Sequence, residues 1–220
     1  MSLVKKQIGS ISFWQKGKNP ELLILSGTHG DEWRVIEILT DYVMKNQDKL
    51  PDFIFVPEVS PSAVVRKTRK NGNKLDLNRN FTDYSDDAEV KANLKIINSY
   101  NFKKVISFHE DTEYEEFYLY DSGLIAEERW RKIMNQAERF DIKMLNGVDD
   151  PADPILGTIF KDGYFSTSSL KVTNCHSGTL GEYLVVKKNN PRYFTVEIPT
   201  KSTIEQKKKL VNLLFVELVF

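Results

Sequence analysis

The sequence of 220 residues contains a single cysteine, Cys175, so the chain cannot form an internal disulfide. This scarcity fits a reducing compartment, and we expect a cytoplasmic protein. Residues 1–15 include basic side chains but lack the apolar segment of a secretory signal. No later run approaches the roughly 18 apolar residues that a membrane-spanning helix needs. The sequence therefore predicts a soluble protein that is not exported.

An excess of charge of either sign is also missing. Lys and Arg total 31, and Asp and Glu total 31. Because nucleic acids and anionic membranes attract basic proteins, we expect neither as a partner. Hydrophobic residues form 40% of the chain, which is enough for a substantial core. With no internal repeat, low-complexity tract or linker, the sequence predicts a single domain over residues 1–220.

Apolar runs alternate with segments of helical period, which is typical of an α/β fold. We expect a three-layer sandwich in which helices flank a mixed, mostly parallel sheet. The expected strands, rich in β-branched and aromatic residues, are 11–15, 22–26, 53–56, 105–108, 117–120 and 194–198. The expected helices, with apolar residues three and four apart, are 32–45, 86–100, 124–140 and 203–219, plus a short one at 180–187.

Two of these helices have start signals in the sequence. Asp86 stands three residues before Glu89, and Ser202 stands three before Glu205. This is the spacing of a capping box, in which each side chain satisfies a free backbone N–H of the first turn. It predicts Asp86 and Ser202 as the capping residues.

Two of the three histidines follow strands. His29 and Glu32 lie in the turn GTHGDE after strand 22–26, and His109 follows strand 105–108 in SFHED. Ligands bind beyond the carboxyl ends of parallel strands, and zinc prefers imidazole nitrogen and carboxylate oxygen. Alone, each histidine would more often be a turn or strand-end residue, and Glu32 a helix N-terminal charge. Together they supply the three protein ligands of a catalytic zinc site.

The stretch from Arg66 to Phe81, RKTRKNGNKLDLNRNF, resembles a signature of zinc metallocarboxypeptidases. GTHGDE before it, SFH after it and FTVEIP near the end complete the motif order of that family across most of the chain. The resemblance implies a zinc carboxypeptidase fold, also called phosphorylase/hydrolase-like. It implies one zinc ion per chain, held by His29, Glu32 and His109.

The resemblance also implies roles for four other residues. Glu197 in FTVEIP matches the general base, and a carboxylate beside a metal can take a proton from the attacking water. Arg69 matches the arginine that stabilises the oxyanion. Asn78 and Arg79 match the pair that binds the free carboxylate of the substrate, which Arg can grip through two parallel hydrogen bonds. These roles imply an exopeptidase.

The chain departs from the family pattern before its Ser-Gly element. The family has a mobile tyrosine there, whereas this chain reads TNCHSG with Asn174 near the expected position. Tyr164, Tyr183 or His176 are candidates to occupy that space. Glu182 lies near the specificity position of the family, where it would favour a substrate with a distal amine or be only a helix-surface charge.

Several functions remain open. The chain is short, and it resembles the compact branch that includes murein peptide amidase, which implies a small peptide substrate such as a cell-wall fragment. The nearest alternative is the aspartoacylase and succinylglutamate desuccinylase branch, which removes acyl groups from amino acids. Those enzymes typically have an additional C-terminal β-rich domain, whereas this chain ends soon after Glu197, which favours the peptidase branch. A third possibility is a catalytically silent member that binds a peptide C-terminus through Asn78 and Arg79.

The sequence has two local clusters of charge. The basic stretch 66–74 includes Arg66 and Lys67, which match no family role and are interpreted as solvated loop charges. The acidic segment is interpreted in the same way. A second metal ion remains an alternative there, with candidate ligands Glu110, Asp111, Glu113, Glu115 and Glu116. Neither cluster indicates an oligomeric state.

Overall fold

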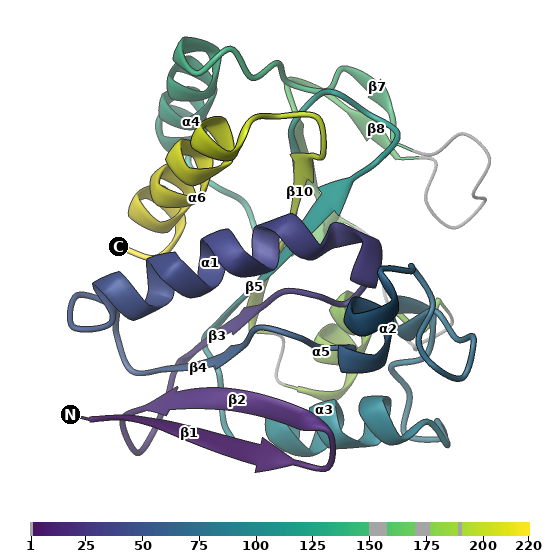
Figure 1. Cartoon of the computed structure of the whole chain (residues 1–220). Coiled ribbons are helices and arrows are strands. Elements are labelled where there is room, and N and C mark those ends of the chain that lie inside the picture. The colour runs from purple at the N-terminus through teal and green to yellow at the C-terminus, as the bar shows by residue number, and fades with distance from the viewer. Residues whose placement is uncertain (1, 150–157, 170–176, 189–190) are drawn as a thin grey trace.

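The computed structural model describes residues 2–149, 158–169, 177–188 and 191–220. One sheet of eight strands has the order β1-β2-β4-β3-β5-β10-β6-β9 (Figure 1). Its strands are β1 (Leu3–Ile8), β2 (Ile11–Lys16), β3 (Leu22–Leu25), β4 (Phe53–Val56), β5 (Lys104–Asp111), β6 (Tyr118–Asp121), β9 (Tyr164–Ser166) and β10 (Arg192–Pro199). Two further strands, β7 (Gly147–Val148) and β8 (Ile159–Phe160), pair with each other.

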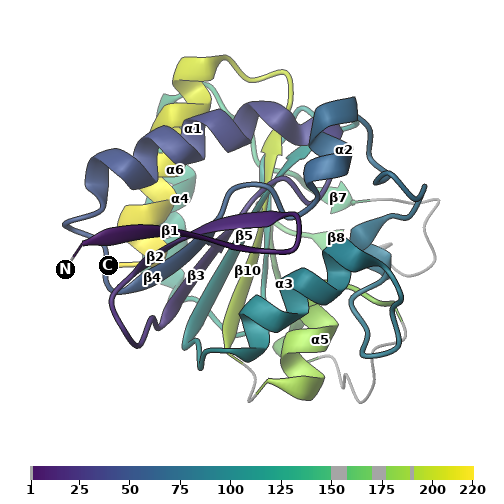
Figure 2. The ribbon, with the colours of Figure 1, turned by 60° about the horizontal axis from the view of Figure 1, so that its bottom comes forward.

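Helices cover both faces of this sheet. They are α1 (Trp33–Asn46), α2 (Pro61–Arg66), α3 (Ala88–Asn98), α4 (Glu127–Arg139), α5 (Leu180–Lys187) and α6 (Ile204–Leu218), with 3₁₀ turns at Gly30–Glu32, Leu77–Arg79 and Thr167–Ser169. Figure 2 shows α1, α4 and α6 on one face and α3 and α5 on the other. The expected α/β three-layer sandwich with a mixed, mostly parallel sheet is therefore confirmed.

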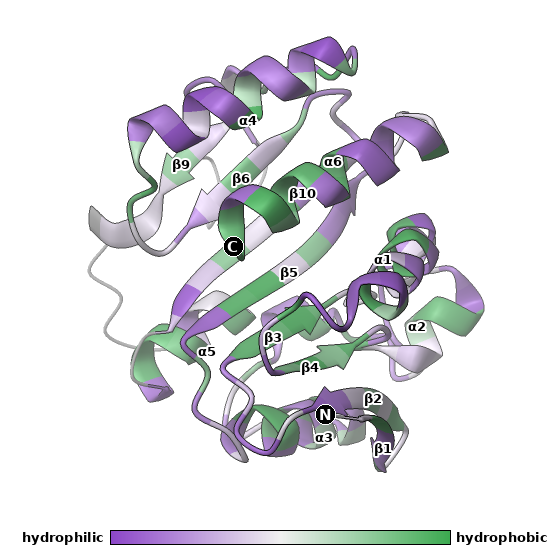
Figure 3. Ribbon diagram, turned by 90° about the vertical axis from the view of Figure 1, so that its left-hand side faces the viewer, coloured by the Kyte–Doolittle hydropathy of each residue, from purple (hydrophilic) through white to green (hydrophobic). Residues whose placement is uncertain are grey.

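The middle of the sheet is parallel and fully buried. Strands β4, β3, β5 and β10 run in the same direction, whereas the pairs β1–β2, β2–β4 and β10–β6 are antiparallel. All residues of β3 and β4 are buried, and Figure 3 shows both strands as hydrophobic along their length. Strands buried on both faces read as continuous apolar runs, which is why the sequence revealed them.

Alternate residues of β5 and β10 serve opposite faces of the sheet. Ile106 and Phe108 point into the core under α1, α4 and α6, where the Phe108 ring stacks on Phe215 of α6 with centroids 5.7 Å apart. The intervening residues, Ser107 and His109, therefore point to the other face. This alternation brings polar side chains to one end of an otherwise apolar sheet.

Both predicted capping residues are wrong by one position. Asp87, not Asp86, caps α3 by accepting hydrogen bonds from the backbone N–H groups of Glu89 and Val90. The buried Asp87 carboxylate also accepts from two asparagine side chains, which fixes it at the helix start. On α6, Thr203 forms a capping box with Gln206, and the Gln206 side chain also donates to a backbone carbonyl beyond the end of α4.

No helix within the described ranges is long and apolar enough to cross a membrane. The described part of the chain also contains strands that the sequence analysis did not predict. These are β1 at the N-terminal edge and β7, β8 and β9 within the irregular region after residue 143.

Candidate functional site

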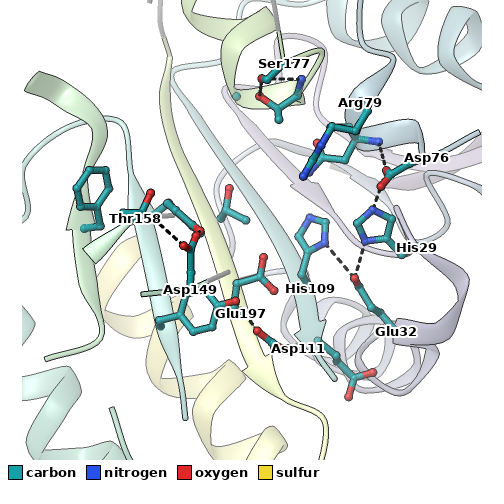
Figure 4. Close-up of a pocket in the computed structure, with 18 of the residues that line it drawn as sticks. His29, Glu32, Asp76, Arg79, His109, Asp111, Asp149, Thr158, Ser177 and Glu197 are labelled. Carbon is teal, nitrogen blue, oxygen red and sulfur yellow. Dashed lines mark hydrogen bonds and ion pairs between the residues drawn. The ribbon is translucent and has the colours of Figure 1, made fainter. Parts of the chain in front are cut away.

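A cavity of about 570 Å³ opens at the carboxyl ends of the parallel strands (Figure 4). Its walls come from the turn after β3, the loop before α3, the ends of β5 and β10, strand β6 and the start of α5. The residues that line it include the seven to which the resemblance assigned a role: His29, Glu32, Arg69, Asn78, Arg79, His109 and Glu197.

The turn after β3 is held by a close approach of two backbones. A Cβ atom at Gly30 would lie 1.9 Å from the carbonyl oxygen of Ala63 in α2, so only glycine fits there. The Gly30 N–H donates to the carbonyl of Thr68 at 2.9 Å. These contacts fix the short 3₁₀ turn that presents His29 and Glu32 to the cavity.

His29, Glu32 and His109 converge on one point and are almost fully buried, with exposed fractions of 2%, 4% and 2%. The Nδ1 atom of His29 lies 2.5 Å from Glu32 Oε1, and Nδ1 of His109 lies 2.9 Å from Glu32 Oε2. Suitable ligand atoms of the three residues all lie within 4.8 Å of one another. The three predicted metal ligands therefore form one compact cluster of two nitrogen donors and one carboxylate.

The outward ring nitrogens of both histidines are also engaged. Nε2 of His29 lies 3.0 Å from Asp76 Oδ1, and Nε2 of His109 lies 3.0 Å from the hydroxyl of Ser107. Hydrogen bonds of this kind fix the ring orientation and leave the opposite nitrogen free to bind a metal. The same arrangement directs both Nδ1 atoms toward the centre of the cluster.

Charges within the cluster change the pKa values of its members. Burial lowers the pKa of His29, but Glu32 and Asp76 outweigh it and raise the value from 6.5 to about 9. Burial alone would raise the pKa of Glu32, because it disfavours the charged carboxylate. The two histidines outweigh this effect and lower the value to about 2. The site is therefore an anionic carboxylate between two histidine rings.

This donor set fits a zinc ion. Glu32 Oε2 is buried, lies at ion-pair distance from His109 and accepts no hydrogen bond from the described residues. An anionic oxygen in that situation needs a cation or a proton. Two imidazoles and one carboxylate are the ligands that zinc takes in catalytic sites, with a fourth position open toward the cavity.

Glu197 lies on β10 beside the cluster. In the parallel pairing of β10 with β5 its partner is His109, and across the antiparallel pair with β6 its partner is Tyr118. Burial, followed by the nearby Glu32 and Asp111 carboxylates, raises the pKa of Glu197 well above its ordinary value. The side chain points into the cavity between the histidines and the opposite wall (Figure 4).

Arg69, Asn78 and Arg79 form one wall of the cavity. Arg69 Nε donates to Asp76 Oδ2 at 3.0 Å, and the Arg69 side chain is half exposed. The side-chain oxygen of Asn78 accepts a hydrogen bond from the Leu180 N–H at 3.1 Å, so its NH₂ group is the one available to a ligand. The guanidinium of Arg79 donates to the Asn78 carbonyl at 3.0 Å.

The opposite wall is acidic and aromatic, and the sequence analysis named only Asp111 among its acidic and tyrosine residues, as a candidate ligand of a second metal ion. The hydroxyl of Tyr118 donates to Asp111, and the hydroxyl of Tyr120 donates to Asp149. Tyr118 and Tyr120 are two residues apart on β6, so their rings share a face of the sheet. The alternating sequence FYLY at residues 117–120 could have indicated that the two tyrosines share a face. No sequence pattern indicated that Asp149 would lie beside them.

Asp76 is a further site residue to which no role was assigned. It accepts from His29 and Arg69, and from the backbone N–H of Asn78 at 2.9 Å. Hydrogen bonding by His29 and the charges of His29 and Arg69 outweigh burial and lower the pKa of Asp76. Its position two residues before Asn78 in DLNR was a signal that could have been used.

The two described residues that could have replaced the missing family tyrosine form hydrogen bonds elsewhere. Tyr164 donates to Asp121 at 2.9 Å, and the buried Tyr183 bonds to Asp83 and Asn98, so neither lines the cavity. Asn174, Cys175 and His176 lie outside the described residues. Glu182 does line the cavity, and its carboxylate accepts from the backbone N–H of Ser177 at 2.8 Å.

The interpretation of the acidic segment as a solvated loop is wrong for its first residue. Glu110 is buried and pairs with Lys207 of α6. Glu115, by contrast, forms an exposed pair with Lys201. His29, Glu32 and His109 form the only cluster of potential metal ligands among the described residues.

Arg66 and Lys67 are exposed as expected, although the Lys67 ammonium lies 4.1 Å from the ring centre of Trp33.

Residues 18–159 match the family described as the Succinylglutamate desuccinylase/Aspartoacylase catalytic domain. The chain belongs to this family. It was the nearest alternative to the peptidase branch above, and the match confirms the superfamily that the motifs predicted. No curated protein matches the chain.

Solved structures with a similar fold come from both branches of the superfamily. A candidate metallopeptidase of Shewanella amazonensis SB2B is 17% identical, with a TM-score of 0.75 over 99% of this chain and 87% of the other. Murein-tripeptide amidase MpaA of Escherichia coli O157 is 19% identical, with a TM-score of 0.59 over 94% and 85%. An aspartoacylase family protein of Mesorhizobium loti is 18% identical, with a TM-score of 0.56 over 98% and 65%. At these identities the likeness shows the fold alone.

Proposed function

We propose that the protein is a zinc-dependent hydrolase that cleaves an amide bond beside a free terminal carboxylate in a small peptide. The observation that supports this most directly is that one cavity contains candidates for four roles: metal binding, proton transfer, oxyanion stabilisation and carboxylate binding. The cavity holds a buried three-ligand cluster, a carboxylate beside it, and two arginines on one wall. This combination suits hydrolysis better than binding alone, because a simple binding site needs no base beside an open metal position.

His29, Glu32 and His109 would hold the zinc. When bound there, zinc supplies Lewis acidity, which makes a carbonyl more electrophilic and water more acidic. The buried position of the three side chains keeps the ligands rigid. Asp76 and Ser107 hold the two imidazole rings in the orientation that this requires.

The remaining steps belong to residues of the chain. Arg79 and the NH₂ group of Asn78 bind the terminal carboxylate and thereby set the position of the scissile amide. Glu197 takes a proton from the attacking water and passes it to the leaving amine. Its position beside His109 on the neighbouring strand, with the side chain pointing into the cavity, suits this double role. Arg69, fixed by Asp76, stabilises the negative charge on the carbonyl oxygen.

The second candidate is an N-acyl amino acid amidohydrolase, which the family match favours. The same residues would bind the carboxylate of the amino acid and cleave the acyl group. The charges across the cavity disfavour a dicarboxylic acyl group, because Asp111 and Asp149 lie on the wall opposite the arginines. A peptide, whose other end has an amine, suits that wall better.

The test compares substrates on zinc-loaded protein. A cell-wall tripeptide of alanine, γ-glutamate and diaminopimelate is compared with N-acetylaspartate, N-succinylglutamate and the C-terminally amidated tripeptide. We expect cleavage of the free tripeptide and little cleavage of its amide. Preferred cleavage of either acyl amino acid would instead support the second candidate. A folded, zinc-containing protein that cleaves none of a broad peptide panel would support the silent binding member.

A further inference from the structure

A buried ion pair lies directly beneath the proposed metal site. Glu110 follows His109 on β5, and its carboxylate pairs with the ammonium group of Lys207 on α6. Both side chains have exposed fractions of 0%. Because neighbouring strand residues point to opposite faces, this pair lies under the sheet while His109 points into the cavity. The α1 and α6 helices lie side by side on that face (Figure 1).

Each member of the pair makes one further hydrogen bond. The second carboxylate oxygen of Glu110 accepts from the backbone N–H of Val35 at 3.1 Å, in the first turn of α1. Lys207 donates to the carbonyl oxygen of Thr200 at 2.9 Å, just after β10. The two side chains thus connect the start of α1, the end of β5, the end of β10 and the start of α6.

These connected positions are the ones that hold the site. Val35 is three residues after Glu32, Glu110 is adjacent to His109, and Thr200 is three residues after Glu197. The Glu110–Val35 bond therefore sets how the two ligand-bearing elements meet. The Lys207–Thr200 bond fixes the position of the carboxyl end of β10, the strand that contains Glu197.

Stability alone does not account for this pair. Removing two charges from water costs free energy, and well-packed apolar residues of similar size often stabilise a protein equally well. Free N–H groups in the first turn of a helix usually donate to the side chain of the N-cap residue, whereas the N-cap residue of α1, Glu32, makes no such bond. The carboxylate that binds its first turn comes from the metal-binding strand instead.

We infer that Glu110 and Lys207 are positioning residues that set the geometry of the zinc ligands and of Glu197. This inference rests on the proposed function. The hydrogen bond between Glu110 and Val35 positions the metal ligands. The hydrogen bond between Lys207 and Thr200 positions Glu197. Each part has its own measurable consequence.

Two double variants separate these parts without leaving a buried charge unpaired. In E110Q/K207M, the glutamine can still accept from Val35, but the bond to Thr200 is lost. We expect a zinc dissociation constant near that of the wild type, with kcat on the cell-wall tripeptide lowered about tenfold and KM little changed. In E110L/K207M both bonds are lost, so we expect the zinc dissociation constant to rise about tenfold as well.

Lys104→Met is the matched control. Lys104 begins β5 and donates to the Leu218 carbonyl at the far end of α6, so it joins the same strand and helix away from the cavity. We expect a lower melting temperature, with the zinc dissociation constant and kcat unchanged. This separates loss of stability from loss of position.

Zinc affinity is measured by chelator competition on the full chain, with circular dichroism to show that each variant is folded. Folded double variants with wild-type zinc affinity and wild-type kcat would overturn the inference while leaving the proposed function intact. A wild-type protein that binds no zinc would overturn the proposed function, and this inference with it. If E110L/K207M does not fold, the lowered kcat of E110Q/K207M with unchanged zinc affinity still decides the role of Lys207.

Discussion

Glu32 is the residue on which the site depends, because both histidines direct a ring nitrogen at its carboxylate. In the metal-free protein, the charge of Glu32 keeps a proton on His29, whose pKa is raised from 6.5 to about 9. That proton stabilises the metal-free fold below the ordinary pKa, and the stabilisation is lost as the pH rises through about 9. Zinc must displace the same proton.

The expected result is a zinc affinity that increases with pH. Between about pH 6.5 and 9, displacement of one proton per zinc raises the apparent affinity by about tenfold per pH unit. Isothermal titration in buffers of different ionisation enthalpy at pH 7 measures the protons released. Release of no proton would contradict the protonation of His29.

Glu197 is the proposed base, so its replacement would separate metal binding from catalysis. We expect Glu197→Gln to retain zinc, because the side chain is not one of the three ligands, and to lose about 10²–10⁴-fold in kcat. Metal content and turnover are measured on the same preparation. Full activity in a zinc-containing Glu197→Gln variant would disprove the assignment of the base.

Asp76 tests the hydrogen bond behind a ligand. In Asp76→Ala the His29 ring loses its partner on Nε2, and we expect the zinc affinity to fall about 10–100-fold. Asp83→Ala, which breaks an exposed pair with Lys187, is the control and should leave zinc affinity unchanged. Equal zinc affinities in the two variants would show that Asp76 does not orient His29.

At the scale of elements, the loop before α5 contacts the wall that we propose binds the substrate carboxylate. Gly178 has a φ of +65°, and a Cβ there would lie 2.2 Å from the Arg79 carbonyl oxygen. We expect Gly178→Ala to displace Asn78 and Arg79 and to raise KM about tenfold, which corresponds to about 1.4 kcal/mol, with zinc content unchanged.

A comparison with Gly9→Ala isolates the clash from the backbone strain. Gly9 has a similar φ of +57°, but its added Cβ would meet only Ala92 at an ordinary 3.6 Å. It should lower the melting temperature without changing KM. If both variants change KM equally, the contact between Gly178 and Arg79 has no role in substrate binding.

The elements also show how far sequence patterns reach. Buried parallel strands such as β3 and β4 were predictable because their apolar runs are continuous. Strand β1 was missed because four of its six residues are exposed and it is held by pairing with β2 at the sheet edge. The cap of α3 was missed by one position because contacts with two asparagine side chains hold Asp87 at the helix start, and local spacing does not reveal such contacts.

At the scale of the whole molecule, the fold gathers residues that are far apart in the chain. The motif residues were predictable because they belong to short patterns. GTHGDE and FTVEIP lie at the carboxyl ends of strands, and DLNR lies in the loop before α3. Asp149 and Lys207 were not, because their roles depend on contacts across the tertiary structure with Tyr120 and Glu110. Sequence patterns thus predicted residues that the fold brings together in the cavity, but not the buried Glu110–Lys207 pair or the contact between Tyr120 and Asp149.

The opposite charges of the two cavity walls lead to a prediction about the substrate. Arg79→Ala should reduce kcat/KM on peptides with a free terminal carboxylate by about 10²-fold, since a hydrogen bond between charged groups contributes up to about 3 kcal/mol. Amidated peptides should be cleaved equally by variant and wild type. An equal loss on both substrates would place Arg79 outside the carboxylate subsite.

The measurement that tests the central claim most directly is the metal content of the purified protein, determined alongside that of His109→Ala. One zinc ion per chain in the wild type, lost in the variant, is the result that the buried cluster of His29, Glu32 and His109 predicts. A wild-type protein that binds no metal even after zinc is added would contradict it, and the cavity would then have to serve another chemistry.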